Sequence, residues 1–276
     1  LLMEQYPVPV LMLSQFTHEG ADLTLKALQL GAMDFVDKSS KGLMDFLALA
    51  SEIVSKIKTI AHIKPKAIAY ESRVLSGYRS RGMVDVVAIG ASTGGPPALG
   101  MILQKLPRNI GFGLLIVQHM PRGFTASLAQ RFDSICAIHV KEAEDLDRIE
   151  PGLALIAPSG SHMKVTHLNS PVDDGGQWGI TLDQEPSRLV HKPSADVLFQ
   201  SVAETYGSRS MGVILTGMGS DGAKGLKAIK DKGALTLAQD EATSVIFGMP
   251  RVAISIGAVD KIVPLTDMAE EIMRNA

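Results

Sequence analysis

The strongest constraint on the fold is a regular alternation of apolar, strand-like runs with helix-like segments from residue 84 onward. Because strands that alternate with helices build βαβ units, this pattern predicts an α/β domain with a doubly wound, mostly parallel sheet. The segment 162–182, with Gly175 and Gly176 near its middle, is predicted to be a β-hairpin excursion. Strands are predicted at 84–89, 112–117, 135–141, 153–157, 211–216 and 234–238, and helices at 97–106, 124–133, 195–206, 223–232 and 266–275.

A shorter alternation precedes this domain in residues 1–61. Strands are predicted at 8–13 and 34–36, and helices at 21–30 and 44–60, the first of them with Leu23, Ala27 and Leu30 on one apolar stripe. Residues 62–83 differ in composition: they contain Pro65, Gly77 and Gly82, five Lys or Arg and one acidic residue. We therefore predict three parts, with boundaries 1–61, 62–83 for an interdomain linker, and 84–276.

Composition excludes several classes of function. A net charge of -2 gives no electrostatic reason to expect a nucleic-acid partner. No apolar run approaches the ~18 to 20 residues of a membrane-spanning helix, so membrane insertion is not predicted. The only cysteine, Cys136, excludes an internal disulfide and favours a cytoplasmic location. It is predicted to be a small buried residue rather than a thiol nucleophile. The chain has no CxxC, HExxH or Walker A motif, so no metal or organic cofactor is predicted.

Three of the predicted strands lead into residues that are able to do chemistry. Ser92 follows the strand at 84–89 in the sequence Gly90-Ala91-Ser92-Thr93-Gly94, which matches the G-x-S-x-G turn of many serine hydrolases. His119 follows the strand at 112–117, and Asp221 follows the strand at 211–216. Since the carboxyl ends of parallel strands meet at one edge of a sheet, these side chains are expected to assemble there as a serine hydrolase constellation.

The serine turn has two competing interpretations. A glycine-rich turn before a helix is also typical of a phosphate site, and it can be a tight turn with no function. The dinucleotide fingerprint is not met, because Ser92 stands where G-x-G-x-x-G requires glycine. If the turn is catalytic, the backbone N–H of Thr93 is the first candidate to stabilise an oxyanion.

The histidine and the aspartate also have alternatives. His191, on an irregular stretch, is the next most interesting histidine and is a candidate for lining a substrate cleft. Asp221 lies in a turn with three glycines, where an aspartate commonly caps the next helix, here the one predicted from residue 223. Asp240, after the strand at 234–238, is a rival third member. Chain order does not decide between them, because catalytic triads occur in several orders.

Residues 84–276 resemble the catalytic domain of the chemotaxis response-regulator protein-glutamate methylesterases, the CheB family. The resemblance implies a triad of Ser92, His119 and Asp221, and so selects Asp221 over Asp240. It implies hydrolysis of glutamate γ-methyl esters on chemoreceptors and deamidation of receptor glutamines. For this reaction we predict oxyanion donors at Thr93 and near Met218, and no cofactor. The matching stretches are 89–95 (IGASTGG), 118–121 (QHMP), 140–143 (VKEA), 156–158 (IAP), 215–222 (LTGMGSDG) and 247–251 (FGMPR).

The same family begins with a receiver domain, and residues 1–61 resemble the C-terminal half of this flavodoxin-like domain. Ser14 takes the place of the small hydroxyl residue after the fourth receiver strand, and Lys38 that of the lysine that contacts the phosphoryl group. The resemblance implies regulation by a chemotaxis histidine kinase, through a complete receiver domain. The phosphoacceptor aspartate and the first three receiver strands would precede Leu1, so no residue is assigned as phosphoacceptor.

Overall fold

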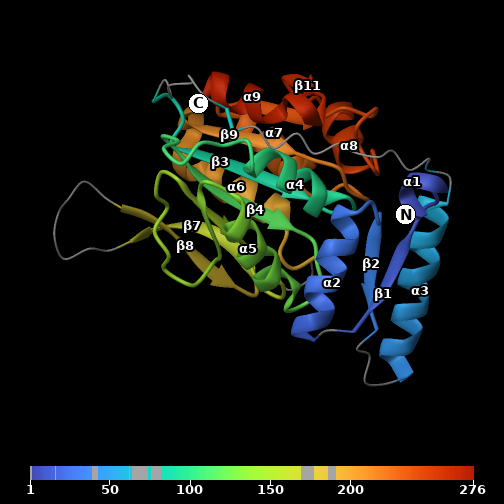
Figure 1. Ribbon diagram of the computed structural model, residues 1–276. Helices are drawn as coiled ribbons and strands as arrows, with labels where there is room; N and C mark the ends of the chain where they lie inside the picture. Colours follow the sequence, from blue (N-terminus) through green and yellow to red (C-terminus); the bar gives the residue numbers. More distant parts are fainter. Residues whose placement is uncertain are drawn as a thin grey trace. The chain divides into compact units, whose positions relative to one another are not determined.

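The computed structural model describes residues 2–15, 17–38, 43–61, 63, 74–75, 82–168, 177–185 and 191–276. The chain divides into two compact units, Leu1–Glu71 and Ser72–Ala276, which are taken in turn below (Figure 1). Most of the predicted linker at 62–83 lies outside the described residues, so its boundaries stay predictions.

Within its described residues, the first unit contains a two-stranded parallel sheet and three helices. Its elements are α1 (Leu2–Gln5), β1 (Leu11–Ser14), α2 (His18–Gln29), β2 (Asp34–Asp37) and α3 (Leu43–Ile60). The predicted order of strand, helix, strand and helix is confirmed, with the short helix α1 in addition. The first strand begins at Leu11 rather than Val8. Pro7 and Pro9 explain the shift, because a proline has no N–H to donate to a strand ladder.

The stripe predicted for the first helix is wrong. Leu23 and Leu30 of this stripe are 66% and 68% exposed. Leu, Ala and Thr occur on several sides of this helix, so a 3.6-residue spacing fits more than one face and cannot select the buried one. The side chains that α2 buries are those of Ala21, Thr24, Leu25 and Leu28.

The second unit is built on a seven-stranded sheet in the order β11-β10-β9-β3-β4-β6-β5. Every neighbouring pair in it is parallel, which confirms the predicted fold class. The strands are β3 (Val86–Ala91), β4 (Gly113–Gln118), β5 (His139–Glu142), β6 (Leu153–Ile156), β9 (Ser210–Ile214), β10 (Leu235–Gln239) and β11 (Lys261–Val263).

The path of the chain makes this sheet doubly wound. It enters at the central strand β3, adds β4, β5 and β6 on one side, and then returns to add β9, β10 and β11 on the other. Because crossovers between parallel strands are right-handed, this reversal places helices on both faces. The reversal lies between β3 and β9, where α/β sheets open a ligand crevice at the carboxyl ends of the strands. The helices are α4 (Gly95–Leu103), α5 (Phe124–Ile135), α6 (Ala195–Tyr206), α7 (Ala223–Asp231), α8 (Met249–Ser255) and α9 (Leu265–Asn275), with a 3-10 turn at Gly207–Arg209.

The predicted hairpin is confirmed as a separate antiparallel pair, β7 (His162–Leu168) with β8 (Gln177–Asp183). Its turn, which includes Gly175 and Gly176, lies outside the described residues. The hairpin packs on α6, where the Val165 N–H donates to the Ser201 hydroxyl at 3.0 Å. It therefore acts as a cover for α6 rather than as a further strand of the main sheet.

Three elements differ from the predictions. The strand predicted at 135–141 starts only at His139, because α5 continues to Ile135 and uses the first part of the apolar run 135–138. The Asp133 carboxylate then accepts the Val140 N–H at 2.9 Å and closes the connection between them. The helix α8 and the three-residue strand β11 were not predicted, since both are too short for periodicity to be measured.

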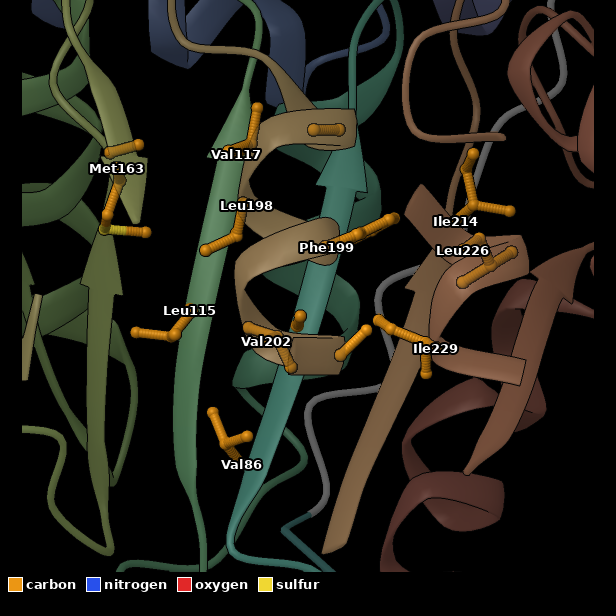
Figure 2. Packing of buried hydrophobic residues seen from close by; sticks show 14 of the residues in the cluster. Val86, Leu115, Val117, Met163, Leu198, Phe199, Val202, Ile214, Leu226 and Ile229 are labelled. Carbon is orange, nitrogen blue, oxygen red and sulfur yellow. The ribbon is translucent and has the colours of Figure 1, made fainter. Parts of the chain in front are cut away.

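One face of the sheet is covered by α6 and α7 through a continuous apolar cluster. Figure 2 shows Leu198, Phe199 and Val202 of α6 lying across β3 and β4, beside Leu226 and Ile229 of α7. All of these side chains are fully buried. This packing determines where the first turn of α6 lies relative to the ends of the central strands.

Phe199→Ala is expected to lower the free energy of unfolding of the second unit by about 3 to 5 kcal/mol, because a fully buried ring is removed and a cavity remains. The change is measured by urea denaturation followed through Trp178, the only tryptophan, which lies in β8 near Tyr206. Phe199→Leu fills most of the space and is expected to cost less than half as much as the alanine variant. Equal losses for the two variants would contradict this account of the core.

Candidate active site

The serine turn lies at the centre of the sheet edge. Ser92 is the first residue after β3, and its N–H donates to the carbonyl of Thr216, which follows β9, at 3.0 Å. On the other side of β3, Ala91 is in register with Gln118, and its carbonyl accepts the His119 N–H at 3.0 Å. Ser92 and His119 therefore leave neighbouring strands at the same level, as their spacing in the sequence predicted.

The two glycines after the serine have separate structural reasons. Gly94 has a φ of 78°, in the left-handed region that favours glycine. At Gly95, an added Cβ would lie 1.9 Å from the Oε1 atom of Gln118. A side chain at this second position would collide with a buried amide, so the turn requires glycine there for close packing and not for flexibility.

Gln118 joins the serine turn to the histidine segment, a role that the sequence analysis missed. Its side chain is 1% exposed, and its Nε2 donates to the carbonyls of both Ser92 and His119 at 2.9 Å. The Oε1 atom has no hydrogen-bond partner among the described residues. The signal available in the sequence was a polar residue at the end of a run of apolar strand residues.

His119 and Asp221 form a hydrogen-bonded pair although they lie far apart in the sequence. The His119 Nε2 is 2.8 Å from the Asp221 Oδ2, and both side chains are largely buried. The remaining ring nitrogen, Nδ1, is buried and has no hydrogen-bond partner among the described residues. In the best-known Ser-His-Asp hydrolases it is Nδ1 that faces the aspartate. Here the two nitrogens are exchanged, which leaves Nδ1 as the nitrogen able to accept a proton.

Asp221 is held by the amino end of a helix. Its Oδ1 accepts from the Ser194 hydroxyl at 2.7 Å and from the Asp196 N–H at 3.1 Å, and its Oδ2 accepts from the Ala195 N–H at 2.7 Å. This helix is α6, and the positive end of its dipole favours a carboxylate. The cap of the following helix α7 is instead Gly222, so the alternative of Asp221 as an ordinary cap of the next helix is wrong.

These contacts determine the charge of Asp221. Burial alone would raise the pKa of this carboxyl, but hydrogen bonds from His119, Ser194 and Ala195 outweigh it and hold the pKa well below its usual range. A group with a depressed pKa stabilises the fold above its unfolded pKa, near 3.8, and loses this effect only as pH falls through the folded value. Asp221 therefore stays ionised throughout the neutral range, opposite His119.

The other candidates occupy distinct positions. Asp240 is in a turn in which its Oδ1 accepts the Thr243 N–H at 3.0 Å, so its carboxylate is engaged there. His191 does reach the site: its ring stacks on that of His119, with centroids 4.3 Å apart and planes 14° from parallel. The structure thus brings Asp221 and His191 to His119, while Asp240 is held by a contact within its own turn.

The two candidate oxyanion donors belong to segments near Ser92: a Cβ added at Gly217, the residue before Met218, would lie 2.7 Å from the Ser92 Cβ. Thr93 is the next residue, and its carbonyl accepts the Thr216 hydroxyl at 2.9 Å. Met218, which is 44% exposed, follows Gly217, whose carbonyl accepts the Met249 N–H at 2.9 Å. Both segments border the serine turn, and the assignment of their N–H groups stays a prediction.

The sequence also predicts that a thiol nucleophile, a metal site and a membrane-spanning helix are absent. Burial, together with the nearby Asp133, raises the pKa of the Cys136 thiol to about 12, which makes it a poor nucleophile. Among the residues that the structure describes, no group of three His, Cys, Asp or Glu side chains is placed to hold a metal ion. No helix in that part of the chain is long and apolar enough to cross a membrane.

A serine turn beside a histidine–carboxylate pair, at the carboxyl edge of a doubly wound parallel sheet, is typical of the α/β serine hydrolases. Comparison with known proteins agrees with this class. A family model described as CheB methylesterase matches residues 87–272. The crystal structure of the Thermotoga maritima CheB methylesterase catalytic domain has a TM-score of 0.66 and 39% identity, and the match covers 70% of this chain and 99% of that one.

Curated relatives match over nearly the whole chain. A protein-glutamate methylesterase/protein-glutamine glutaminase of Pyrococcus abyssi is 44% identical over 282 residues, 99% of this chain and 75% of its own length. One of Bordetella bronchiseptica is 45% identical over 279 residues, 99% of this chain and 77% of its own length. The chain belongs to the CheB methylesterase family, which confirms the resemblance seen in its sequence motifs.

Gln118→Leu is expected to slow the labelling of Ser92 by a serine-directed fluorophosphonate on the order of 10- to 100-fold, because the serine turn loses its link to the histidine segment. Gln118→Glu is expected to slow it further, since a carboxylate would face two carbonyl oxygens. The measurement is the labelling rate followed by mass spectrometry.

Gln104→Leu is the matched control for this pair of variants. The amide of Gln104 donates only to the Gly100 carbonyl within its own helix, at 3.0 Å, so the labelling rate is expected to stay at the wild-type value. If Gln118→Leu also labels at the wild-type rate, the bridging amide has no part in orienting Ser92.

Proposed function

We propose that this chain hydrolyses glutamate γ-methyl esters on chemoreceptors, with release of methanol, and deamidates receptor glutamines at the same site. Ser92 is the nucleophile, His119 the general base and Asp221 its partner. The observation that carries the proposal is the 2.8 Å contact of His119 with Asp221 at the sheet edge where the serine turn also lies. Membership of the family, whose relatives are named for these two activities, supports the choice of substrate.

The proposed reaction runs through a covalent glutamyl-enzyme. Ser92 Oγ attacks the γ-carbonyl while its proton moves to Nδ1 of His119, and the ionised Asp221 stabilises the imidazolium that forms. The oxyanion of the tetrahedral intermediate accepts hydrogen bonds from the N–H groups of Thr93 and Met218. When the intermediate collapses, His119 returns the proton to the methoxy oxygen, and methanol leaves. A water molecule, deprotonated by His119, then attacks the acyl carbonyl, releasing the glutamate and restoring Ser92.

Deamidation needs no additional group. When the γ-carbon carries an amide, the tetrahedral intermediate expels the nitrogen, which takes its proton from His119 and leaves as ammonia. The acyl-enzyme is the same as in ester hydrolysis, so its breakdown yields glutamate from both substrates. One set of residues therefore supports both activities.

The alternative function, a nucleotide- or phosphate-binding regulatory module, lacks donors at the helix where it would need them. A phosphate at a helix start is held by N–H groups of the first turn. In α4, the Gly95 N–H already donates to the Ser92 carbonyl at 2.8 Å, and Pro96 and Pro97 have no N–H. The N–H of Ala98 donates to the Gly94 carbonyl at 3.3 Å. This helix start favours the hydrolase.

We further propose that the first unit belongs to a receiver domain through which a chemotaxis histidine kinase acts on the enzyme. Ser14 and Lys38 support this, because both lie at the carboxyl end of the parallel pair β1 and β2. The Ser14 carbonyl accepts the Lys38 N–H at 2.7 Å, which brings the small hydroxyl residue next to the lysine predicted to contact a phosphoryl group. The substrate of the proposed reaction, a receptor's cytoplasmic helices, places the enzyme in the cytoplasm.

Ser92→Ala is expected to abolish methanol release from a methylated chemoreceptor fragment, because no nucleophile remains to form the acyl-enzyme. The assay measures methanol over time, and Trp178 fluorescence checks that the variant is folded. Ser134→Ala is the control: this serine lies in the last turn of α5, where its hydroxyl donates to the Arg131 carbonyl, and turnover by this variant is expected to be unchanged. Turnover by Ser92→Ala at the wild-type rate would exclude the proposed mechanism.

Asp221→Asn is expected to lower kcat for methyl-ester hydrolysis on the order of 10³- to 10⁴-fold, because the amide does not stabilise the imidazolium of His119. Asp240→Asn keeps an acceptor for the Thr243 N–H and is expected to retain the wild-type kcat. The pair decides between the two aspartates that the sequence left open. A loss confined to Asp240→Asn would reverse the assignment.

A further inference from the structure

The His191 ring lies flat against the ring that carries the proton in the proposed reaction. The two imidazole centroids are 4.3 Å apart, with 14° between the planes, so the contact is face to face. At its edge, His119 is bound to Asp221 through Nε2. A single hydrogen bond at one edge leaves a ring free to rotate about the axis of that bond. A second ring against its face removes this freedom and determines the direction of Nδ1.

The position of His191 is determined by the same short segment that holds Asp221. The carbonyl of Lys192 accepts the Gly160 N–H at 3.0 Å, which ties the segment to the loop before β7. Two residues further on, the Ser194 N–H donates to Nδ1 of the buried His162 at 3.2 Å, and its hydroxyl donates to Asp221. Residues 191–196 thus supply both the stacked ring and the donors to the carboxylate. The residues that directly follow His191 are thus anchored at both Lys192 and Ser194.

We propose that His191 is a positioning residue of this active site, whose ring packs on the face of His119 and holds its Nδ1 in the direction of the Ser92 hydroxyl. The inference rests on the proposed function, since it assigns His119 the role of general base. His191 itself takes no proton from substrate or serine in this scheme. It acts only through the orientation and the charge environment of the His119 ring.

The stack works best when His191 is uncharged. His119 becomes an imidazolium when it takes the serine proton, and the π face of a neutral aromatic ring carries partial negative charge that attracts a cation. A protonated His191 would instead oppose the new charge at a short distance. The titratable groups that act on His191 are His119, after β4, and Asp221, before α7. Partial burial and His119 lower the pKa of His191 while Asp221 raises it, and the net shift is downward, which favours the neutral ring.

Two substitutions separate the ring from its nitrogens. His191→Ala removes the stack and is expected to lower kcat for methanol release on the order of 10- to 100-fold, with little change in KM, because Nδ1 loses its orientation. His191→Phe keeps a flat ring and is expected to retain kcat within about threefold of wild type at pH 8. Wild-type kcat in His191→Ala, or an equal loss in His191→Phe, overturns the proposal.

The pH profile gives a readout that a merely structural residue would not move. In the wild-type chain the acid limb of kcat/KM is expected to be steep, with a slope approaching about two, because protonation of either stacked ring stops the reaction. His191→Phe removes one of these two protonations, so the slope is expected to fall to about one. Identical acid limbs overturn the charge part of the proposal. His139→Phe, at an exposed histidine that contacts Asp133, is the control and is expected to keep the wild-type profile.

A measurement without turnover distinguishes failure of this inference from failure of the proposed function. In the full chain with labelled histidines, the ring carbon signals of His119 are assigned by NMR and followed with pH in wild type and His191→Ala. Loss of the stack is expected to shift these signals. If wild type releases no methanol but the shift is seen, the function fails and the stack stands. Unchanged His119 signals overturn the inference whatever the activity.

Discussion

The site depends on the three hydrogen bonds that the amino end of α6 donates to the Asp221 carboxylate. These hydrogen bonds keep a largely buried carboxyl ionised. The Asp221 carboxylate in turn holds the ring of His119 through its contact with Nε2. The helix that donates them is positioned by its own buried face, since Phe199 and its neighbours lie across β3 and β4, the strands that lead to Ser92 and His119. Packing of one helix thus places the carboxylate of Asp221 against His119, at the sheet edge where Ser92 also lies.

The topology explains how residues 92, 119 and 221 meet without any local signal that joins them. The sheet begins at β3 and grows in both directions, so the strands before Ser92, His119 and Thr216 are neighbours in its centre. A crevice at this point needs no dedicated loops, because it is where the connections diverge. The turn at Ser92 lies at this edge, and the prolines of α4 remove N–H groups that would otherwise favour a bound anion.

Much of this arrangement was predictable from the sequence, for reasons that are local. Apolar runs of strand length and glycine-rich turns are short-range patterns, so the central strands, the hairpin and the placement of Ser92, His119 and Asp221 at strand ends were all recovered. The buried face of α2 was not predicted, because the spacing of apolar residues does not distinguish Leu23 from Leu28. Only packing against the neighbouring strand distinguishes the two residues. Gln118 and Ser194 were missed for the same reason. Their function lies in partners 26 and 27 residues away, which no spacing rule identifies.

The exchange of the two nitrogens of His119 also follows from these partners. Asp221 is carried by the loop before α7 and is held by α6, so it approaches the imidazole at Nε2. Nδ1, nearer the backbone of the residue that follows β4, then has no hydrogen-bond partner among the described residues, and Ser92 follows the adjacent strand β3. In the proposed reaction Nδ1 acts as the base, and it lies closer to the backbone than Nε2 does. The direction of Nδ1 therefore depends more on the plane of the imidazole ring. The proposed packing of His191 against that plane thus acts together with the Asp221 contact to orient His119.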